Sequence, residues 1–120
     1  MTAAWMPQLS VAGAWAVLAV AIAFEVAGTT SMRLSEGFTR WVPSVLIFVF
    51  YACSFTLNTM IIGRLGLSVV YAVWSGVGTV ATALIGILYF KEPATAMKMV
   101  SITLVVVGVF GLHAATRQSG

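Results

Sequence analysis

The chain contains few charged residues, and this shortage excludes most soluble classes of protein. Only 8% of its 120 residues are charged, whereas 61% are hydrophobic and the mean hydropathy is +1.06. Because a soluble domain carries about 25% charged residues, water cannot be the solvent for most of this surface. The net charge of +3 is also too thinly spread to form the clustered basic patch that nucleic-acid binding requires.

Cysteine and histidine are just as scarce. Cys53 and His113 are the only residues of their types. A single cysteine excludes an intrachain disulfide and a CxxC metal pair, and a lone histidine far from any carboxylate in sequence gives no metal signature. We therefore expect no metal and no cofactor, and no pattern indicates an enzyme.

The first ten residues, MTAAWMPQLS, contain no lysine or arginine. A cleaved secretory signal begins with a basic segment. Although residues 19–21 and 21–23 resemble cleavage sites, we expect the apolar stretch that follows to be retained. Residues 1–10 are then a short N-terminal extension.

Four long apolar stretches make up most of the chain. Each has about 20 residues, the length that a helix needs to cross a hydrocarbon core of about 30 Å. The sequence predicts an all-α integral membrane protein, with one domain over residues 11–115 and a polar tail over 116–120. The predicted helices cover about 11–32, 41–62, 68–90 and 96–115, and polar breaks fall at 33–40, 63–66 and 91–93.

The six basic residues give only a weak indication of orientation. They divide four against two between the two ends of the predicted helices: Arg33, Arg40, Lys91 and Lys98 against Arg64 and Arg117. Since cytoplasmic loops carry an excess of such residues, an N-terminus outside the cell is modestly favoured. The alternative interpretation is a chain that inserts both ways round.

One acidic residue, Glu25, lies inside the first apolar stretch. A charged side chain at the centre of a membrane helix costs roughly 2.5–3.5 kcal/mol, and such residues usually mark a pathway for ions, protons or substrates. The alternative is a glutamate that extends to the interface from near a helix end. Glu25, however, lies roughly 10 Å inside the expected end, at a rise of about 1.5 Å per residue.

Four helices do not easily enclose a polar path, so we expect a second copy of the chain. A homodimer would bring two copies of Glu25 together in an eight-helix bundle. Mutual repulsion and desolvation favour the protonated form of such carboxylates, while the ionised form can hold a cation. Protons and a small cationic molecule would then compete for Glu25, as in a proton/cation exchanger.

Aromatic residues in two other stretches are candidates to surround a cation. Tyr71 and Trp74 are three residues apart and share a helix face, and a desolvated cation–π contact is worth about 2 kcal/mol or more. An aromatic belt at the membrane interface explains them equally well. Tyr51 lies deeper, and its hydroxyl needs either a carboxylate or a backbone carbonyl as its partner.

Small and hydroxyl-bearing residues follow Glu25 closely. Gly28 shares its helix face and would leave room for a ligand beside the carboxylate. The hydroxyls of Thr29 and Thr30 are expected to donate back to helix carbonyls, and the alternative is that they belong to the site.

Further small residues lie in the last two stretches. Gly76 and Gly78 permit either a conformational hinge or tight helix packing. Ser101 and Gly108 predict a helix–helix contact in the last stretch, either within the chain or between two copies.

Together these residues resemble the small multidrug resistance family of bacterial exporters, over about residues 15–115. A lone membrane glutamate is a weak signal, but this glutamate combined with the other segments is a specific one. The resemblance rests on Glu25-Val-Ala-Gly-Thr-Thr30, on Ser35-Glu-Gly-Phe-Thr-Arg40 with Pro43-Ser44, and on Tyr71-Ala-Val-Trp-Ser-Gly-Val-Gly78.

The resemblance implies a four-helix protomer in the bacterial inner membrane that works as an antiparallel, dual-topology dimer. It also implies exchange of protons for lipophilic cations such as quaternary ammonium compounds. By position, Glu25 resembles the shared proton- and substrate-binding carboxylate, and the last helix resembles the dimerisation helix. The residues that resemble the substrate pocket are Tyr51, Tyr71 and Trp74, with Ser54 as a polar neighbour.

Two other interpretations stay open. Phe90-Lys91-Glu92-Pro93 resembles the guanidinium-exporting branch, and residues 67–71 resemble subunits of paired polyamine exporters. The chain would then export guanidinium or polyamines, either alone or as half of a heterodimer. The other interpretation is a non-transporting membrane subunit whose Glu25 pairs with a partner's basic residue, but it leaves Tyr71 and Trp74 unexplained.

Overall fold

The computed structural model describes residues 10–118, with side chains as far as residue 115, and this part of the chain folds into four helices with no strand. The helices are α1 (Val11–Leu34), α2 (Trp41–Leu65), α3 (Leu67–Leu88) and α4 (Ala96–Gln118). All four are long and apolar enough to cross a membrane. The predicted all-α membrane fold is confirmed.

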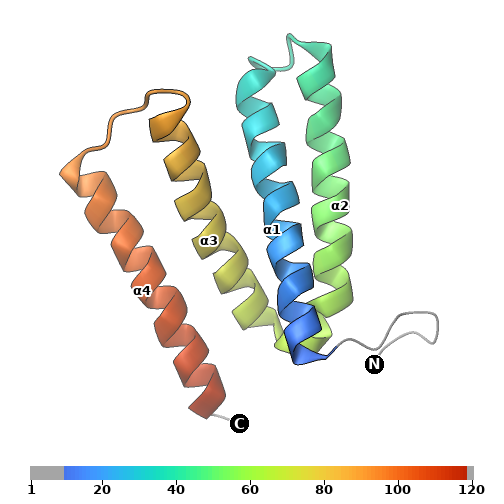
Figure 1. Ribbon diagram of the computed structural model, residues 1–120, viewed down its shortest axis with the longest axis vertical. Helices are drawn as coiled ribbons and strands as arrows, with labels where there is room; N and C mark the ends of the chain where they lie inside the picture. Colours follow the sequence, from blue (N-terminus) through green and yellow to red (C-terminus); the bar gives the residue numbers. More distant parts are fainter. Residues whose placement is uncertain (1–9, 119–120) are drawn as a thin grey trace.

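The helices form a broad, thin bundle (Figure 1), with principal extents of 42 × 36 × 17 Å. Helices α1 and α2 lie side by side, α3 packs against both of them, and α4 packs against α3 at the outer edge. The α1–α2 and α3–α4 connections lie at one end of the bundle. The α2–α3 junction lies at the opposite end, with the start of α1 and the end of α4.

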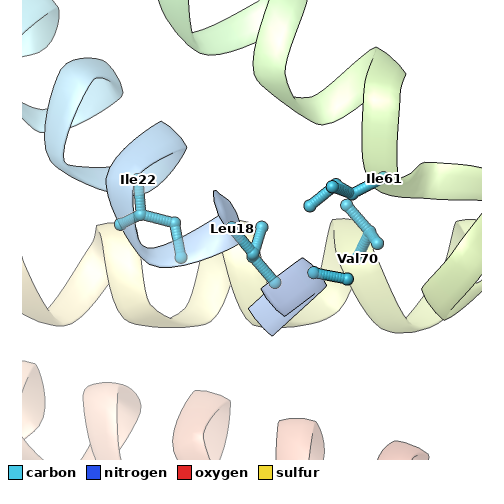
Figure 2. Packing of buried hydrophobic residues seen from close by; sticks show 5 residues of the cluster. Leu18, Ile22, Ile61 and Val70 are labelled. Atoms are coloured by element: carbon cyan, nitrogen blue, oxygen red, sulfur yellow. The ribbon is translucent and has the colours of Figure 1, made fainter. Parts of the chain in front are cut away.

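A small apolar cluster joins the first three helices. Leu18 and Ile22 of α1 form this cluster with Ile61 of α2 and Val70 of α3 (Figure 2), and all four side chains are buried. Because lipid is as apolar as leucine, such a cluster stabilises the bundle by close packing rather than by removal from water.

The helix bounds differ from the predicted ones where glycine is tolerated. We expected a break at residues 63–66, but α2 continues through Gly63 and Arg64, since one glycine in a helix costs only about 1 kcal/mol. Gly66 alone separates α2 from α3, with φ of +95° in the region that other residues avoid. Helix α1 extends two residues further than predicted, and α3 ends two residues earlier.

Helix α4 is the least buried element. None of its apolar span is buried within the chain, and Gly76 of α3 makes room for its close approach to that helix. A Cβ at Gly76 would lie 2.5 Å from Cγ2 of Val109. The helix includes residues 116–118 of the predicted tail, while most of the predicted N-terminal extension lies outside the described residues.

Candidate functional site

Glu25 lies where α1, α2 and α3 meet, and its two carboxylate oxygens have different surroundings. Oε1 accepts hydrogen bonds from the hydroxyl of Thr29 at 3.0 Å and from that of Tyr51 at 3.3 Å. These two hydroxyls are also bonded to each other, at 2.7 Å. Oε2 faces Gly78, where a Cβ would lie 3.2 Å from it.

The number of hydroxyl protons limits these hydrogen bonds. Thr29 and Tyr51 each have a single hydroxyl proton. Either hydroxyl can be the donor in the bond between them, and that bond uses one of the two protons, so Oε1 is left with the other. Within the described part of the chain Oε2 has no donor, so this oxygen is left for a proton or a ligand.

Glu25 also lacks a basic partner among the side chains that the structure describes. The ion pair found there joins Lys98 to Glu92, at 3.9 Å near the α3–α4 connection. An ionised carboxylate inside a membrane helix is normally paired. Within the described residues, an ionised Glu25 therefore has no basic side chain to compensate its charge.

A cavity of about 250 Å³ opens beside the carboxylate. Tyr71 and Trp74 form one side, with ring centroids 5.8 Å apart and the rings edge to face. The hydroxyl-bearing side of α3 forms another wall. The lining residues are Glu25, Thr29, Tyr71, Trp74, Ser75, Gly78, Thr79 and Thr82.

The aromatic rings continue from this cavity into α2. Phe55 meets Trp74 edge to face at 5.7 Å and lies 5.6 Å from the ring of Tyr51. The sequence interpretation missed Phe55. Its spacing of four residues from Tyr51, which places both on one helix face, would have indicated it.

Not every predicted pocket residue reaches the cavity. Ser54 is fully buried, and its hydroxyl donates to the carbonyl of Ala21 at 2.7 Å, so it joins α1 to α2 instead. Gly28 makes room for the ring of Tyr51 rather than for a ligand. A Cβ there would lie 2.8 Å from Cδ2 and Cε2 of Tyr51.

The two threonines after Glu25 behave differently. Thr30 donates to the carbonyl of Val26 at 2.8 Å, as expected. The same expectation is wrong for Thr29, because the carboxylate and the Tyr51 hydroxyl are within its reach. Tyr51 likewise uses the carboxylate, and not the backbone carbonyl that was its alternative partner.

The glycines of α3 serve close approach in this structure. The helix is continuous from Leu67 to Leu88, with Gly78 giving space to Glu25 and Gly76 to α4. Ser101 and Gly108 are exposed on α4, and a Cβ at Gly108 would meet nothing within 4 Å. The predicted hinge and the predicted dimer contact remain predictions.

A second cavity, of about 400 Å³, lies toward the end with the α1–α2 and α3–α4 connections. It shares Thr29, Thr79 and Thr82 with the first cavity and is bordered by Arg33 and Lys98. Hydroxyl groups therefore line the way from Glu25 toward the basic end of the bundle. Thr79 and Thr82 were not predicted, although their three-residue spacing on α3 indicates a shared face.

Comparison with known proteins identifies the family. The family model described as Small Multidrug Resistance protein matches residues 13–105, which include every residue described above at the Glu25 cavity. The chain belongs to the small multidrug resistance family. This membership makes it a bacterial multi-pass membrane transporter rather than an enzyme, as the sequence predicted.

Several members of the small multidrug resistance family are similar over most of their length. The uncharacterized membrane protein YvaE of Bacillus subtilis (strain 168) is 46% identical over 99 residues, 82% of this chain and 83% of YvaE. Multidrug resistance protein EbrA of Bacillus atrophaeus is 40% identical over 96 residues, covering 80% and 91%. Quaternary ammonium compound-resistance protein QacC of Staphylococcus aureus is 35% identical over 96 residues, covering 80% and 90%.

Proposed function

We propose that this transporter is a proton-coupled antiporter that exports lipophilic cations, including quaternary ammonium compounds. Proton and cation take turns at Glu25. The observation that carries the proposal is a membrane carboxylate with one donor-free oxygen, beside an aromatic cavity and without a basic partner among the described side chains. The name of QacC supports quaternary ammonium compounds as substrates, and the name of EbrA supports a role in multidrug resistance.

The cavity suits a poorly hydrated cation. The carboxylate supplies charge, and the faces of Trp74 and Tyr71 supply cation–π attraction of about 2 kcal/mol once water is excluded. A quaternary ammonium ion gives up little hydration on entering such a site. Compact, strongly hydrated metal cations are therefore disfavoured.

Competition between proton and cation follows from the same geometry. Thr29 and Tyr51 hold Oε1 in place, which leaves Oε2 to take either a proton or the cation. Once protonated, the carboxyl is neutral and loses its attraction for the cation. The hydroxyl-lined cavity walls give protons a polar route toward the basic end of the bundle.

The proposal includes a second copy of the chain. The cavity of about 250 Å³ is smaller than the roughly 300–1,000 Å³ of typical ligand pockets, and α4 has an unburied apolar span. In an antiparallel, dual-topology homodimer, two copies would meet through Ser101 and Gly108 of α4. The second copy would enlarge the cavity and cover the apolar span of α4. The weak charge bias between the two ends is compatible with insertion both ways round.

The test is export by purified protein in liposomes under an imposed pH gradient. Glu25→Gln keeps the shape of the side chain and removes its charge, and we expect proton-driven export of tetraphenylphosphonium to fall by about 100-fold. Glu36→Gln, which removes an exposed loop carboxylate, is the matched control and should export normally. Undiminished export by the Glu25 variant would refute the mechanism. Export of guanidinium but not of tetraphenylphosphonium by the unmodified protein would favour the guanidinium alternative.

A further inference from the structure

Asn58, in the interior of α2, is a buried amide that the proposed mechanism does not use. It is 7% exposed, and within residues 10–118 neither its amide nitrogen nor its amide oxygen has a hydrogen-bond partner. An unpaired amide is costly in an apolar interior, and more so inside a membrane, where no water competes. A leucine would fill the same place without that cost. The amide therefore indicates that a hydrogen-bonding partner binds beside Asn58.

A second unpaired group lies nearby. Asn58 of α2 borders a third cavity of about 290 Å³ between α2 and α3, and Trp74 of α3 also lines this cavity. The indole nitrogen of Trp74 is buried and also has no partner among the described residues. Two independent polar groups without partners therefore flank one cavity.

This third cavity adjoins the Glu25 site. Tyr71 and Trp74 line both cavities. One ligand can therefore extend past their rings from the Glu25 cavity into the cavity beside Asn58. Asn58 follows Tyr51 by seven residues, which places both on one face of α2 and separates them by roughly 10 Å along the axis. The two polar ends of the site are thus about two helical turns apart.

We propose that Asn58 and the indole of Trp74 form a hydrogen-bonding subsite for a polar group that the exported cation carries about 10 Å from its charge. The inference rests on the proposed function, whose substrate class it narrows to cations with a remote hydroxyl, amide or carbonyl. An asparagine amide both donates and accepts, and its terminal torsion is broad, so it can turn toward an occupant. Asn58 is then a residue that determines specificity.

The probes are two cations that differ in one hydroxyl: octyltrimethylammonium and its ω-hydroxyoctyl analogue. Their dissociation constants are measured by calorimetry on the purified protein in lipid nanodiscs. The ratio of the two constants isolates the remote group, because headgroup and chain are shared. We expect Asn58→Leu to lower the relative affinity for the hydroxylated cation by about tenfold, the worth of one buried hydrogen bond.

Thr59→Val is the matched control. Thr59 borders the same cavity, but its hydroxyl already donates to the carbonyl of Phe55 at 2.7 Å, so the ratio should not change. Trp74→Phe is a second test variant, which keeps an aromatic ring and removes the N–H. We expect it to shift the ratio in the same direction by about threefold.

An unchanged ratio in both test variants overturns the subsite, and it is also the result expected if an internal water satisfies Asn58. Glu25→Gln separates this failure from that of the proposed function. If Glu25→Gln binds neither cation while the ratio of dissociation constants is unchanged in Asn58→Leu, the subsite is refuted and the proposed function is supported. If that ratio shifts in Asn58→Leu but Glu25→Gln binds both cations normally, the subsite is supported and the proposed function is refuted.

Discussion

Helices α1 and α4 are both apolar enough to cross a membrane, yet they place their polar and small residues differently. Helix α1 turns Glu25 and Thr29 toward α2 and α3, where both are hydrogen-bonded. Helix α4 leaves Ser101 and Gly108 exposed at its surface. In a membrane, hydropathy does not distinguish a helix that binds a ligand from one that packs against another helix. The position of the polar groups relative to neighbouring helices does.

Helices α1 and α4 are therefore expected to respond differently to substitution. On α1, Oε1 of Glu25 and the hydroxyl of Thr29 have partners among the described residues, whereas Oε2 has none, so substitutions at this site should alter ligand binding in proportion to the contact removed. Ser101 and Gly108 of α4 are exposed at the helix surface, and substitutions there should alter association between copies.

Among these substitutions, the largest effect on cation binding is expected at Trp74 of α3, beside the Glu25 carboxylate. Trp74→Ala removes the main aromatic face and should weaken tetraphenylphosphonium binding by about 30-fold, from the loss of about 2 kcal/mol of cation–π attraction. Binding to protein in nanodiscs gives the measurement. Trp41→Ala, at an exposed position at the start of α2, is the control. An affinity unchanged by Trp74→Ala would remove Trp74 from the site.

A smaller effect is expected from crowding behind the carboxylate. Gly28→Ala places a methyl group 2.8 Å from the Tyr51 ring, which must move and lose its bonds to Thr29 and Glu25. Because the moved ring also loses its contact with Phe55, we expect cation affinity to fall by about tenfold, more than from loss of the hydroxyl alone. Gly63→Ala makes the same change in α2 where nothing lies within 4 Å, and should leave affinity unaltered. Equal affinities in the two variants would contradict the proposed role of Tyr51.

Helix α4 provides the contrasting test. Gly108→Leu has open space within the chain, so the protomer should fold normally while association between copies weakens by about fivefold. Energy transfer between labelled copies in liposomes measures the association. Val107→Leu, equally exposed one position away, is the control. Unimpaired association of the Gly108 variant would place the dimer contact elsewhere.

The smallest effect is expected from a single hydroxyl. Tyr51→Phe removes the Tyr51 hydroxyl and its hydrogen bonds, but the Thr29 hydroxyl can still donate to Glu25. Cation affinity should therefore fall by only about threefold. Tyr89→Phe, on an exposed ring at the end of α3, checks for effects unrelated to the site. A change as large as that of Trp74→Ala would mean that Tyr51 contacts the cation itself.

Much of the fold and part of the site could be predicted from the sequence. Membrane-spanning length predicts the four helices, and the cost of a buried charge indicates Glu25. Spacing along one helix pairs Tyr71 with Trp74, because both partners belong to one element.

Contacts between helices could not be predicted in this way. The roles of Ser54 and Gly28 depend on how α2 packs against α1, which the local pattern does not specify. Asn58 is a different case, because the reasoning that indicated Glu25 applies equally to an amide inside an apolar stretch. It was missed although its signal was present.

Cation binding measured as a function of pH tests the shared site most directly. If proton and cation compete for Glu25, tetraphenylphosphonium should release protons on binding. For each proton displaced, its affinity should fall by about tenfold for every unit by which the pH is lowered. At higher pH, where the carboxyl is ionised, the affinity should level off. Glu25→Gln should abolish both the pH dependence and the proton release. Binding that is independent of pH in the unmodified protein, or an equal pH dependence in the Glu25→Gln variant, would contradict the account.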